Sequence, residues 1–377
     1  MSRGGQVGLK SVYMRGGTSR ALFFHLDDLP GSIEDRVSWG PIFAAALGSP
    51  DPGGRQLDGL GGGISSLSKI AVIGPPTHPD ADVDYIFAQV AVKDSNVSYR
   101  GNCGNISAAV APYAIDQGLV EVSGDEALVR IHHVASGKII HAHVHIEDGG
   151  AAVSGDFAIQ GVAGTGSPIR LDFLDPGGSA TGKLLPTGQA REILTVGGRA
   201  LEVSMVDAAN PVVFVRADAV GLNGNEKPAD IDADAVALAL FEELRVAASL
   251  AMGVTGSEDE ARRLVPNLPL VAIVSPPPEG ADVQVRMISA GQPHKATPLT
   301  GAMCLAVAAR LPGSVIVDVT GPIAPGTLRI SHASGILPVD AVVDDGVARS
   351  VSVFRTARRL MEGSVLVPAT ALARQLS

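Results

Sequence analysis

The pattern of apolar and polar positions along the chain is mostly that of β-strands. Short runs with two-residue alternation or with many β-branched residues recur throughout, and Gly, Pro or Asp bounds most of them. Such runs are typical of buried or half-buried strands. They predict strands at residues 21–25, 70–73, 83–92, 127–132, 138–146, 193–206, 212–216, 270–274, 283–288 and 314–319.

Apolar positions with the three- to four-residue spacing of helices are fewer. They predict helices near residues 32–47, 105–117, 232–252, 301–311 and 368–375. Many strands combined with a few long helices favour an α+β fold with curled sheets over a regularly alternating parallel sheet.

Two segments of the chain resemble each other. A strand, a turn of small residues and an Ala-rich helix follow one another in SYRGNCGNISAAVAPYA at 98–114 and again in KATPLTGAMCLAVAARL at 295–311. Both helices carry Ala and Val on nearly every face, as an enclosed helix does. Because Gly, Pro, Ser and Thr dominate residues 161–188, the domain boundary is expected there. The sequence predicts an internal duplication with domains at 1–180 and 181–377, where the last strand or helix could return to the first domain.

Composition disfavours several classes of protein. Hydrophobic residues make up 46% and charged residues 18% of the 377 positions, as in a folded protein. A formal charge of −10 without a Lys/Arg cluster disfavours a nucleic-acid surface, because basic side chains must neutralise the phosphates. No apolar stretch is long enough to cross a bilayer and MSRGGQVGLK has no apolar core, so we expect a cytoplasmic protein without a membrane partner.

The two cysteines, Cys103 and Cys304, are expected to be free thiols, since a large chain without a signal sequence indicates a reducing compartment. Cys103 lies in the turn GNCGN, directly before a predicted helix. The glycines permit close approach of a ligand, and the helix presents free N–H groups and the positive end of its dipole. These features fit an anion site at Asn102, Gly104 and Asn105 with a reactive thiolate at Cys103, and equally a small residue buried at a tight turn.

The motif MRGGTSR near the N-terminus carries a second set of polar groups. Thr18 and Ser19 offer hydroxyl groups, and Arg20 offers a guanidinium that can bind a carboxylate through two hydrogen bonds. A hairpin turn with solvated polar residues accounts for the same motif.

The motif DGLGGGISSLSK is a third candidate. Ser65 and Ser66 lie in this loop, which runs into Lys69 just before a predicted strand. Most lysines are exposed, but a lysine that follows so many small residues could be drawn inward toward a ligand.

Further motifs follow in a fixed order through nearly the whole chain. They are GSPDPGGRQLDG at 48–59, SSLSK at 65–69, DVDYIFAQV at 82–90, DFLDPGGS at 172–179, LPTG at 185–188, AANPVVFV at 208–215, GQPHKAT at 291–297 and SHASGILPV at 331–339. With MRGGTSR and GNCGN, they make the chain resemble the 2-methylaconitate isomerase family, also called the methylaconitate/methylitaconate isomerase group. The resemblance implies the diaminopimelate-epimerase-like fold, in which two pseudo-symmetric domains each wrap a curled sheet around a central helix and one active site lies between them.

The resemblance also implies an activity, namely the movement of an allylic proton in a small unsaturated di- or tricarboxylate without a metal or cofactor. The catalytic lysine of the family falls on Lys69 and its cysteine on Cys103, which either carries a second proton or only lines the site. Epimerases of this fold place a second cysteine at the other central helix, where this chain has PLTG. Thr300 and Gly301 are therefore candidate substrate-binding residues, and Cys304, about one turn inside the helix, is expected to be core.

A lysine can act as a base only when it is neutral, so its pKa has to fall from the ordinary value of about 10.4. Burial and the positive ends of helix dipoles lower the pKa, whereas bound carboxylates raise it. The sequence leaves the direction of the net shift open.

Histidines fall into two groups. His141, His143 and His145 alternate along one predicted strand, and we interpret them as a solvated sheet face rather than a metal site, because no second ligand cluster accompanies them. His294 and His332 lie in motifs of the resemblance, which makes each of them a candidate for substrate contact or for a structural hydrogen bond.

Three functions stay open from the sequence. The first is an isomerase of 2-methylaconitate, aconitate or methylitaconate. Similar proteins act on 4-oxalomesaconate, and the glycine before Asn102 favours the methylaconitate and methylitaconate side. The second is an amino-acid racemase or epimerase, which the missing second thiol disfavours. The third is a non-catalytic accessory protein that binds an acid or a partner enzyme. A homodimer is compatible with the sequence, although no motif decides the oligomeric state.

Overall fold

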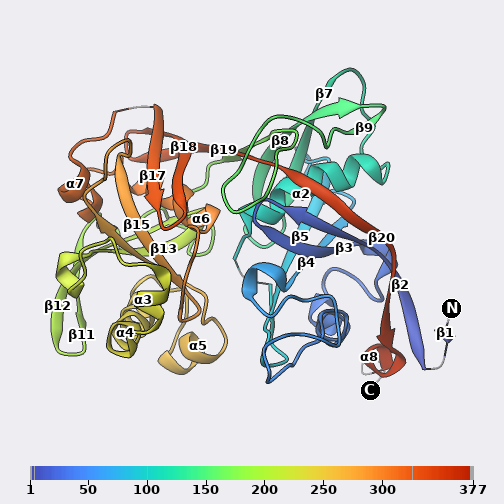
Figure 1. Ribbon diagram of the computed structural model, residues 1–377, viewed down its shortest axis with the longest axis horizontal. Coiled ribbons are helices and arrows are strands. Elements are labelled where there is room, and N and C mark those ends of the chain that lie inside the picture. Colours follow the sequence, from blue (N-terminus) through green and yellow to red (C-terminus); the bar gives the residue numbers. More distant parts are fainter. Residues whose placement is uncertain (1, 4, 100, 325, 374–377) are drawn as a thin grey trace. The chain divides into compact units, whose positions relative to one another are not determined.

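The chain divides into two compact units, seen in a computed structural model that describes residues 2–3, 5–99, 101–324 and 326–373. Unit 1 comprises residues 1–171 and 354–377, and unit 2 comprises residues 172–353. Figure 1 colours the chain from blue to red and shows the red strand β20 beside the blue strand β2 of unit 1. The division falls a few residues before the boundary expected at 180, and the last strand and helix belong to unit 1.

Unit 1 is built on a sheet with mixed strand directions. β2 pairs antiparallel with β20 and with β3, β3 runs parallel to β4, and β4 runs antiparallel to β5. β5 then pairs antiparallel with β6 and parallel with β7, which forms a hairpin with β8. The strands are β1 Ser2–Arg3, β2 Gln6–Gly16, β3 Ser19–His25, β4 Lys69–Gly74, β5 Val83–Val90, β6 Val97–Ser98, β7 Glu126–His133, β8 Lys138–Glu147, β9 Gly150–Ala151 and β20 Ala357–Pro368.

Unit 2 repeats this order of pairings. β12 pairs antiparallel with β13, β13 runs parallel to β14, and β14 runs antiparallel to β15. β15 pairs antiparallel with β16 and parallel with β17, which forms a hairpin with β18. The strands are β11 Glu192–Val196, β12 Arg199–Ala208, β13 Asn210–Arg216, β14 Leu270–Ser275, β15 Val283–Ser289, β16 Gln292–Pro293, β17 Gly326–His332 and β18 Gly335–Asp344, while β10 Ile169–Leu174 and β19 Val347–Arg355 run across the unit boundaries. The matching directions confirm the predicted duplication.

One helix in each unit is enclosed by that unit's own sheet. In unit 1, α2 (Gly104–Asp116) contacts β2, β3, β4, β7, β8, β9 and β20, and all its residues from 106 to 115 are buried. In unit 2, α6 (Leu299–Ala308) contacts β12, β13 and β18 and is buried throughout. Small residues permit this close approach: a Cβ added to Gly16 would lie 2.4 Å from the carbonyl oxygen of Asn105 in α2. Figure 1 labels α2 and α6 within their units.

The other face of each sheet packs against a second helix. In unit 1, Leu22, Phe24, Ile70 and Val72 form one cluster with residues of α1 (Gly40–Leu47). In unit 2, β13 and β14 pack in the same way against α4 (Ala235–Ala251). Because strand side chains alternate between faces, the odd-numbered residues of β3 and β4 face α2. The tilted ring contact of Phe23 with Tyr113 of α2, with centroids 5.4 Å apart, agrees with this assignment.

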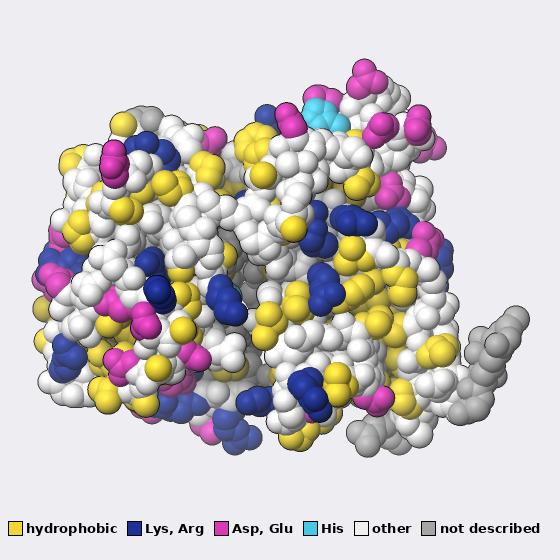
Figure 2. Space-filling view, viewed as in Figure 1, with side chains coloured by type: hydrophobic (Ala, Val, Ile, Leu, Met, Phe, Trp, Pro, Cys, Tyr) yellow, Lys and Arg dark blue, Asp and Glu magenta, His cyan; other side chains and the backbone are white. Residues whose placement is uncertain are grey.

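Shorter helices connect these elements. They are η1 Leu26–Asp28, η2 Arg36–Trp39, η3 Ser65–Leu67, η4 Asp218–Val220, α3 Pro228–Asp232, α5 Glu258–Arg263, α7 Val315–Thr320 and α8 Ala369–Ala373. Within the described residues, no helix has the length and apolar character needed to span a membrane. Acidic, basic and apolar side chains are interspersed on the visible face of each unit (Figure 2).

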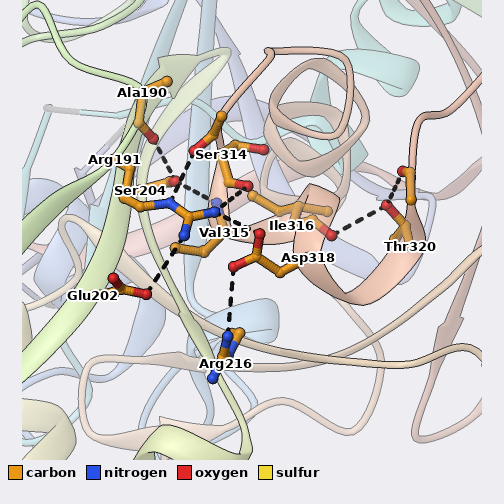
Figure 3. A network of polar contacts seen from close by, with 12 residues as sticks. Ala190, Arg191, Glu202, Ser204, Arg216, Ser314, Val315, Ile316, Asp318 and Thr320 are labelled. Carbon is orange, nitrogen blue, oxygen red and sulfur yellow. Dashed lines mark hydrogen bonds and ion pairs between the residues drawn. The ribbon is translucent and has the colours of Figure 1, made fainter.

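One predicted strand is a helix. The β-branched run at 314–319 predicted a strand, but α7 occupies this segment. Ile316 is buried, whereas Asp318 accepts a hydrogen bond from Arg191 at 2.6 Å on the exposed side (Figure 3). Arg191 also donates to the carbonyl oxygen of Ser314 at the start of the helix. Tertiary contacts on both sides of the helix therefore override the strand preference of the β-branched residues.

Other predicted boundaries also shift. The strand expected at 193–206 is the hairpin of β11 and β12, because Gly197 and Gly198 adopt positive φ angles and form the turn. In the segment 32–47, helix begins only at η2 and continues as α1. The helix expected at 368–375 is α8, and the last two residues of that prediction lie outside the described residues.

Asp207 of β12 is a buried carboxylate on which we expect the stability of unit 2 to depend. Its oxygens accept hydrogen bonds from Ser179 Oγ at 2.6 Å, Ala180 N at 2.8 Å, Thr181 N at 2.7 Å and Thr181 Oγ1 at 2.9 Å. Asp207→Ala should lower the free energy of unfolding by about 2–4 kcal/mol, because these donors lose their acceptor. Denaturant titration measures the effect. Asp218→Ala, which removes an exposed carboxylate, should cost less than about 1 kcal/mol, and equal losses would contradict this account.

Candidate active site

Lys69 is a buried amine at the start of β4. The residue is only 8% exposed. Its Nζ donates a hydrogen bond to Gln89 Oε1 at 2.5 Å and lies 5.1 Å from the centroid of the Phe87 ring. Gln89 lies opposite Lys69 in the β4–β5 ladder, so all three side chains share the face of the sheet that α2 covers.

Burial lowers the pKa of Lys69, because the ammonium form loses its hydration. The smaller opposing effect is the electrostatic interaction with Cys103, which raises the same pKa. The net direction is downward, which favours the neutral amine relative to an exposed lysine. A neutral amine has the lone pair that a general base requires.

The backbone fixes the orientation of Gln89. Its Nε2 donates to the carbonyl oxygens of Ser68 at 2.9 Å and of Ser65 at 3.1 Å. Because the amide nitrogen is engaged in this way, the amide oxygen faces Lys69. Ser65 is exposed and Ser66 is half-buried in η3, and Ser65 contacts Gln89 through its backbone carbonyl oxygen.

A second glutamine stabilises the loop behind the lysine. Gln56 is 1% exposed and has a φ of +55°. Its Nε2 donates to Ser68 Oγ at 2.7 Å and to Ser49 Oγ at 2.9 Å, and its Oε1 accepts from Gly63 N at 3.0 Å. The motif GSPDPGGRQLDG thus ties the segment before β4 into one hydrogen-bonded loop.

Cys103 is the residue immediately before α2. Its backbone is extended, with φ −119° and ψ 91°, and its carbonyl oxygen accepts the hydrogen bond of Ser107 N at 2.9 Å. The side chain is half-buried and the thiol is free. Asn102 Oδ1 accepts a hydrogen bond from Ser107 Oγ at 3.4 Å. The first N–H groups of α2 have no partner within the helix, so the positive end of the helix dipole lies beside the thiol and favours an anion there.

The MRGGTSR loop packs directly on the start of α2. Asn105 Nδ2 donates to Thr18 Oγ1 at 3.2 Å, and Thr18 N donates to Asn105 Oδ1 at 3.5 Å. Gly17 has a φ of +50°, and a Cβ at this position would lie 2.1 Å from Asn105 Oδ1. Only glycine fits here, both for its backbone conformation and for the space available. Arg355 Nε donates to the same Asn105 oxygen at 3.2 Å.

Ser19 and Arg20 point to opposite faces of the sheet. Ser19 is buried and shares its face with Phe23 and α2. Arg20 lies on the face of the α1 cluster, where its guanidinium stands over the ring of Tyr13 at 5.5 Å. The structure therefore brings together Thr18, Asn105 and Cys103 at the start of α2, and places Arg20 apart from them.

The corresponding place in unit 2 keeps the framework but lacks both reactive groups. Asn210 Nδ2 donates to Thr300 Oγ1 of α6 at 3.1 Å, as Asn105 of α2 donates to Thr18. The residue before α6 is Pro298, whereas the residue before α2 is Cys103. The first residue of β14 is Leu270, whereas the first residue of β4 is Lys69. The reactive side chains that we describe thus lie in unit 1.

The remaining candidates of unit 2 have identifiable packing or hydrogen-bonding contacts. A Cβ added to Gly301 would lie 2.4 Å from the sulfur of Met287, so this glycine permits close packing of α6 on β15. His294 N donates to the Met287 carbonyl oxygen at 2.8 Å, and His332 Nδ1 accepts from the backbone N–H of Ser334 at 3.1 Å.

Cys304 is fully buried and its Sγ donates to the Val206 carbonyl oxygen at 3.3 Å. Burial raises the pKa of Cys304 well above its usual value.

The histidines of β8 lie between buried positions. Ile140, Ala142 and Val144 are buried, whereas His143 is half-buried and His145 is exposed. Among the residues that the structure describes, no three His, Cys, Asp or Glu side chains are grouped so that they could hold a metal ion.

The sequence as a whole matches one protein family. The family described as PrpF protein covers residues 6–368 of the chain. The chain belongs to the PrpF family. Three relatives of this PrpF-family chain carry names of isomerases. They are the 3-methylitaconate isomerase of Eubacterium barkeri (42% identity, 96% of this chain and 98% of the relative), the (4E)-oxalomesaconate Delta-isomerase of Novosphingobium sp. (38%, 94% and 96%) and the 2-methyl-aconitate isomerase of Cupriavidus necator (36%, 97% and 98%).

Solved structures confirm the fold of this PrpF-family chain. A crystal structure of methylitaconate-delta-isomerase, 40% identical, superposes with a TM-score of 0.80 over 98% of this chain and 97% of that chain. A hydroxyproline epimerase from Agrobacterium vitis, only 12% identical, superposes with a TM-score of 0.58 over 98% of this chain and 94% of that one. The fold is therefore diaminopimelate-epimerase-like, as the resemblance implied.

Three residues at the site were missed from the sequence. Gln89 is the only polar side chain between Phe87 and the end of β5, which was a weak signal within the motif DVDYIFAQV. In the sequence, Phe87 has the pattern of an ordinary core residue of a strand. Arg355 is far from MRGGTSR and GNCGN in the sequence, and no local pattern around it indicates a ligand. Only the tertiary structure brings it to Asn105.

Proposed function

We propose that this PrpF-family protein is a cofactor-independent isomerase that moves an allylic proton in a small unsaturated di- or tricarboxylate. The observation that supports the proposal most directly is the buried Lys69. Burial lowers the pKa of this residue, and Gln89 accepts a hydrogen bond from its Nζ on the face covered by α2. Acids of the methylitaconate, 2-methylaconitate and aconitate type fit this chemistry, and we place the reaction in the cytoplasm.

The proposed reaction is a 1,3 proton shift. Lys69 Nζ takes a proton from the allylic carbon, and the electron pair left behind delocalises through the double bond into a carboxylate as a dienolate. A proton then returns to another carbon of the delocalised system, from the Lys69 ammonium or from the Cys103 thiol. The formula of the acid is unchanged, while the position or the geometry of the double bond differs.

The start of α2 is suited to the negative charge of this reaction. The free N–H groups of the helix and the positive end of its dipole stabilise a carboxylate and the charge that develops on the dienolate. The Thr18–Asn105 contact fixes the loop beside these N–H groups. Donors that are already in place need little rearrangement when the charge develops, and this is what makes them effective in catalysis.

The test is turnover in D₂O with a panel of 2-methylaconitate, methylitaconate, aconitate, 4-oxalomesaconate and diaminopimelate, followed by NMR. For at least one of the unsaturated acids, we expect deuterium at an allylic carbon and a change in the position or the cis-trans geometry of the double bond. Exchange only at the α-carbon of diaminopimelate would replace the isomerase with an epimerase. Binding of an acid without exchange or turnover would identify an accessory protein.

A second candidate substrate within this reaction class is 4-oxalomesaconate. The Novosphingobium relative is named as an isomerase of (4E)-oxalomesaconate, whereas the Gly101–Asn102 sequence favours methylaconitate or methylitaconate. The ratio of kcat/KM values for the unsaturated acids of the panel decides between the two, because kcat/KM measures discrimination between competing substrates.

Gln89 should set the pH at which Lys69 becomes active. Its amide oxygen stabilises the ammonium form, so Gln89→Leu should move the acidic limb of the kcat/KM profile to lower pH by about one unit. Gln89→Glu should move the limb to higher pH, because a carboxylate beside the ammonium raises the pKa of Lys69. The kcat/KM profile reports the free enzyme and therefore measures both shifts. Gln6→Leu, an exposed site in the same unit, should leave the limb in place. A common direction for the two Gln89 variants would contradict this role.

A further inference from the structure

Arg355 at the end of β19 is a buried cation without a carboxylate partner. The residue is 7% exposed. Its Nε donates to Asn105 Oδ1 at 3.2 Å, and its Nη1 donates to the carbonyl oxygen of Phe354 at 2.7 Å. Among the described residues, the acceptors of its hydrogen bonds are thus neutral oxygens, and no ion pair with an acidic side chain is formed.

Another buried arginine of the same chain shows the usual compensation. Arg245, which is 2% exposed, forms an ion pair with Glu242 at 2.6 Å and donates to three backbone carbonyl oxygens. A buried charge is costly unless it is paired and hydrogen-bonded. Burial lowers the pKa of Arg355 to about 10, so the guanidinium is still charged at neutral pH. The positive charge is therefore maintained without a counter-ion from the protein.

The surroundings add further positive potential. Asn105 is the second residue of α2, so Arg355 lies against the end of the helix where N–H groups are free and the dipole is positive. Thr18 bonds the same Asn105 side chain, which holds a hydroxyl group beside the guanidinium. A guanidinium presents five N–H donors in a planar fork that matches a carboxylate. Within the part of the chain that the structure describes, the hydrogen bonds of Arg355 use only Nε and Nη1.

We propose that Arg355 is a substrate-binding residue that receives one carboxylate of the acid, together with Thr18, Asn105 and the start of α2. This inference specifies the substrate class of the proposed function, since it requires an anionic carboxylate next to the site of Lys69 and Cys103. In this proposal, Arg355 has the carboxylate-binding role that the sequence suggested for Arg20. The structure places Arg20 on the other face of the sheet.

Binding of a saturated analogue tests the proposal without turnover. We choose tricarballylate, which has three carboxylates and no double bond, together with its two monoamides, and we measure Kd by calorimetry. Arg355→Met should weaken tricarballylate binding by about 10- to 100-fold, because charge-assisted hydrogen bonds are lost. It should weaken at least one monoamide much less, because that ligand lacks the carboxylate that Arg355 would bind.

The matched control is Arg358→Met, which makes the same change in charge at an exposed position three residues away. It should leave the three Kd values within about twofold. If Arg355→Met does not fold, Arg355→Gln removes the charge and keeps polar hydrogens for Asn105, and the same loss of selectivity is expected. Equal weakening of all three ligands, or unchanged binding of tricarballylate, would overturn the proposal and leave Arg355 with a structural role.

The two proposals fail in different ways. If no acid of the panel is turned over but tricarballylate binds through Arg355, the proposed isomerase activity is wrong and the carboxylate site stands. If an unsaturated acid is isomerised but Arg355→Met binds tricarballylate as tightly as the unchanged protein, the activity stands and the role of Arg355 is wrong.

Discussion

Lys69→Met should reduce turnover by at least roughly 10²–10⁴-fold, the contribution of a positioned general acid or base. The substitution removes the amine that we propose takes the allylic proton and keeps an unbranched side chain of similar length. The lysine is buried against Phe87, so an apolar thioether should pack in its place and the fold should be retained. Turnover of the preferred acid and deuterium exchange at its allylic carbon measure the effect, and both should disappear together.

The control for this prediction is Lys10→Met, which removes an exposed lysine of β2 in the same unit. It should change neither turnover nor exchange by more than about twofold. A folded Lys69→Met protein that still exchanges at nearly the normal rate would show that another group removes the proton. Cys103 would then become the principal base, and the epimerase reaction would have to be considered again.

Cys103→Ser should have the second largest effect, a loss of roughly 10²-fold in turnover, at the lower end of the contribution of a positioned acid or base. Serine is close in size, but its hydroxyl group is a much weaker acid than a thiol and returns a proton less readily. Cys103 lies at the start of α2 and interacts electrostatically with Lys69, so the substitution should also change the pH dependence of turnover. Steady-state kinetics across pH measures both effects.

Cys304→Ala is the matched thiol control. Cys304 is fully buried in α6 and donates to a backbone carbonyl oxygen of β12, so its loss should lower stability by about 1–2 kcal/mol and leave turnover within a few-fold. If the two variants lost activity equally, or if Cys304→Ala lost more, then unit 2 would contribute a reactive thiol and the assignment of the chemistry to unit 1 would be wrong.

The duplicated architecture could be predicted because its signals are local. Both central helices are rich in Ala and Val, both follow a turn of small residues, and helices that must fit inside a sheet require this composition. The ion pair of Asp82 with Arg130 recurs as Asp282 with Arg329, with the same backbone and side-chain hydrogen bonds. Such a repeated contact could have supported the duplication from the sequence, because the spacing of its two residues is nearly the same.

Local patterns were misleading where distant contacts decide the conformation. The run at 314–319 has the composition of a strand, yet Arg191 and the core place it in α7. The run at 193–206 predicts a single strand, but its two adjacent glycines form the turn of a hairpin. Period-two alternation identifies a strand but gives no information about which distant residues it will contact.

The sequence by itself determined the class of fold and the repeat, because small-residue turns, enclosed helices and strand alternation are patterns of neighbouring residues. The motifs made Lys69 and Cys103 candidates, and the family resemblance implied the roles that we propose for them. Only the tertiary structure decided their surroundings. Gln89 faces Lys69 across a strand ladder, and Arg355 reaches Asn105 from 250 positions away in the sequence. Burial, hydrogen-bond orientation and uncompensated charge are properties of contacts between distant segments, so they exist only once the chain has folded.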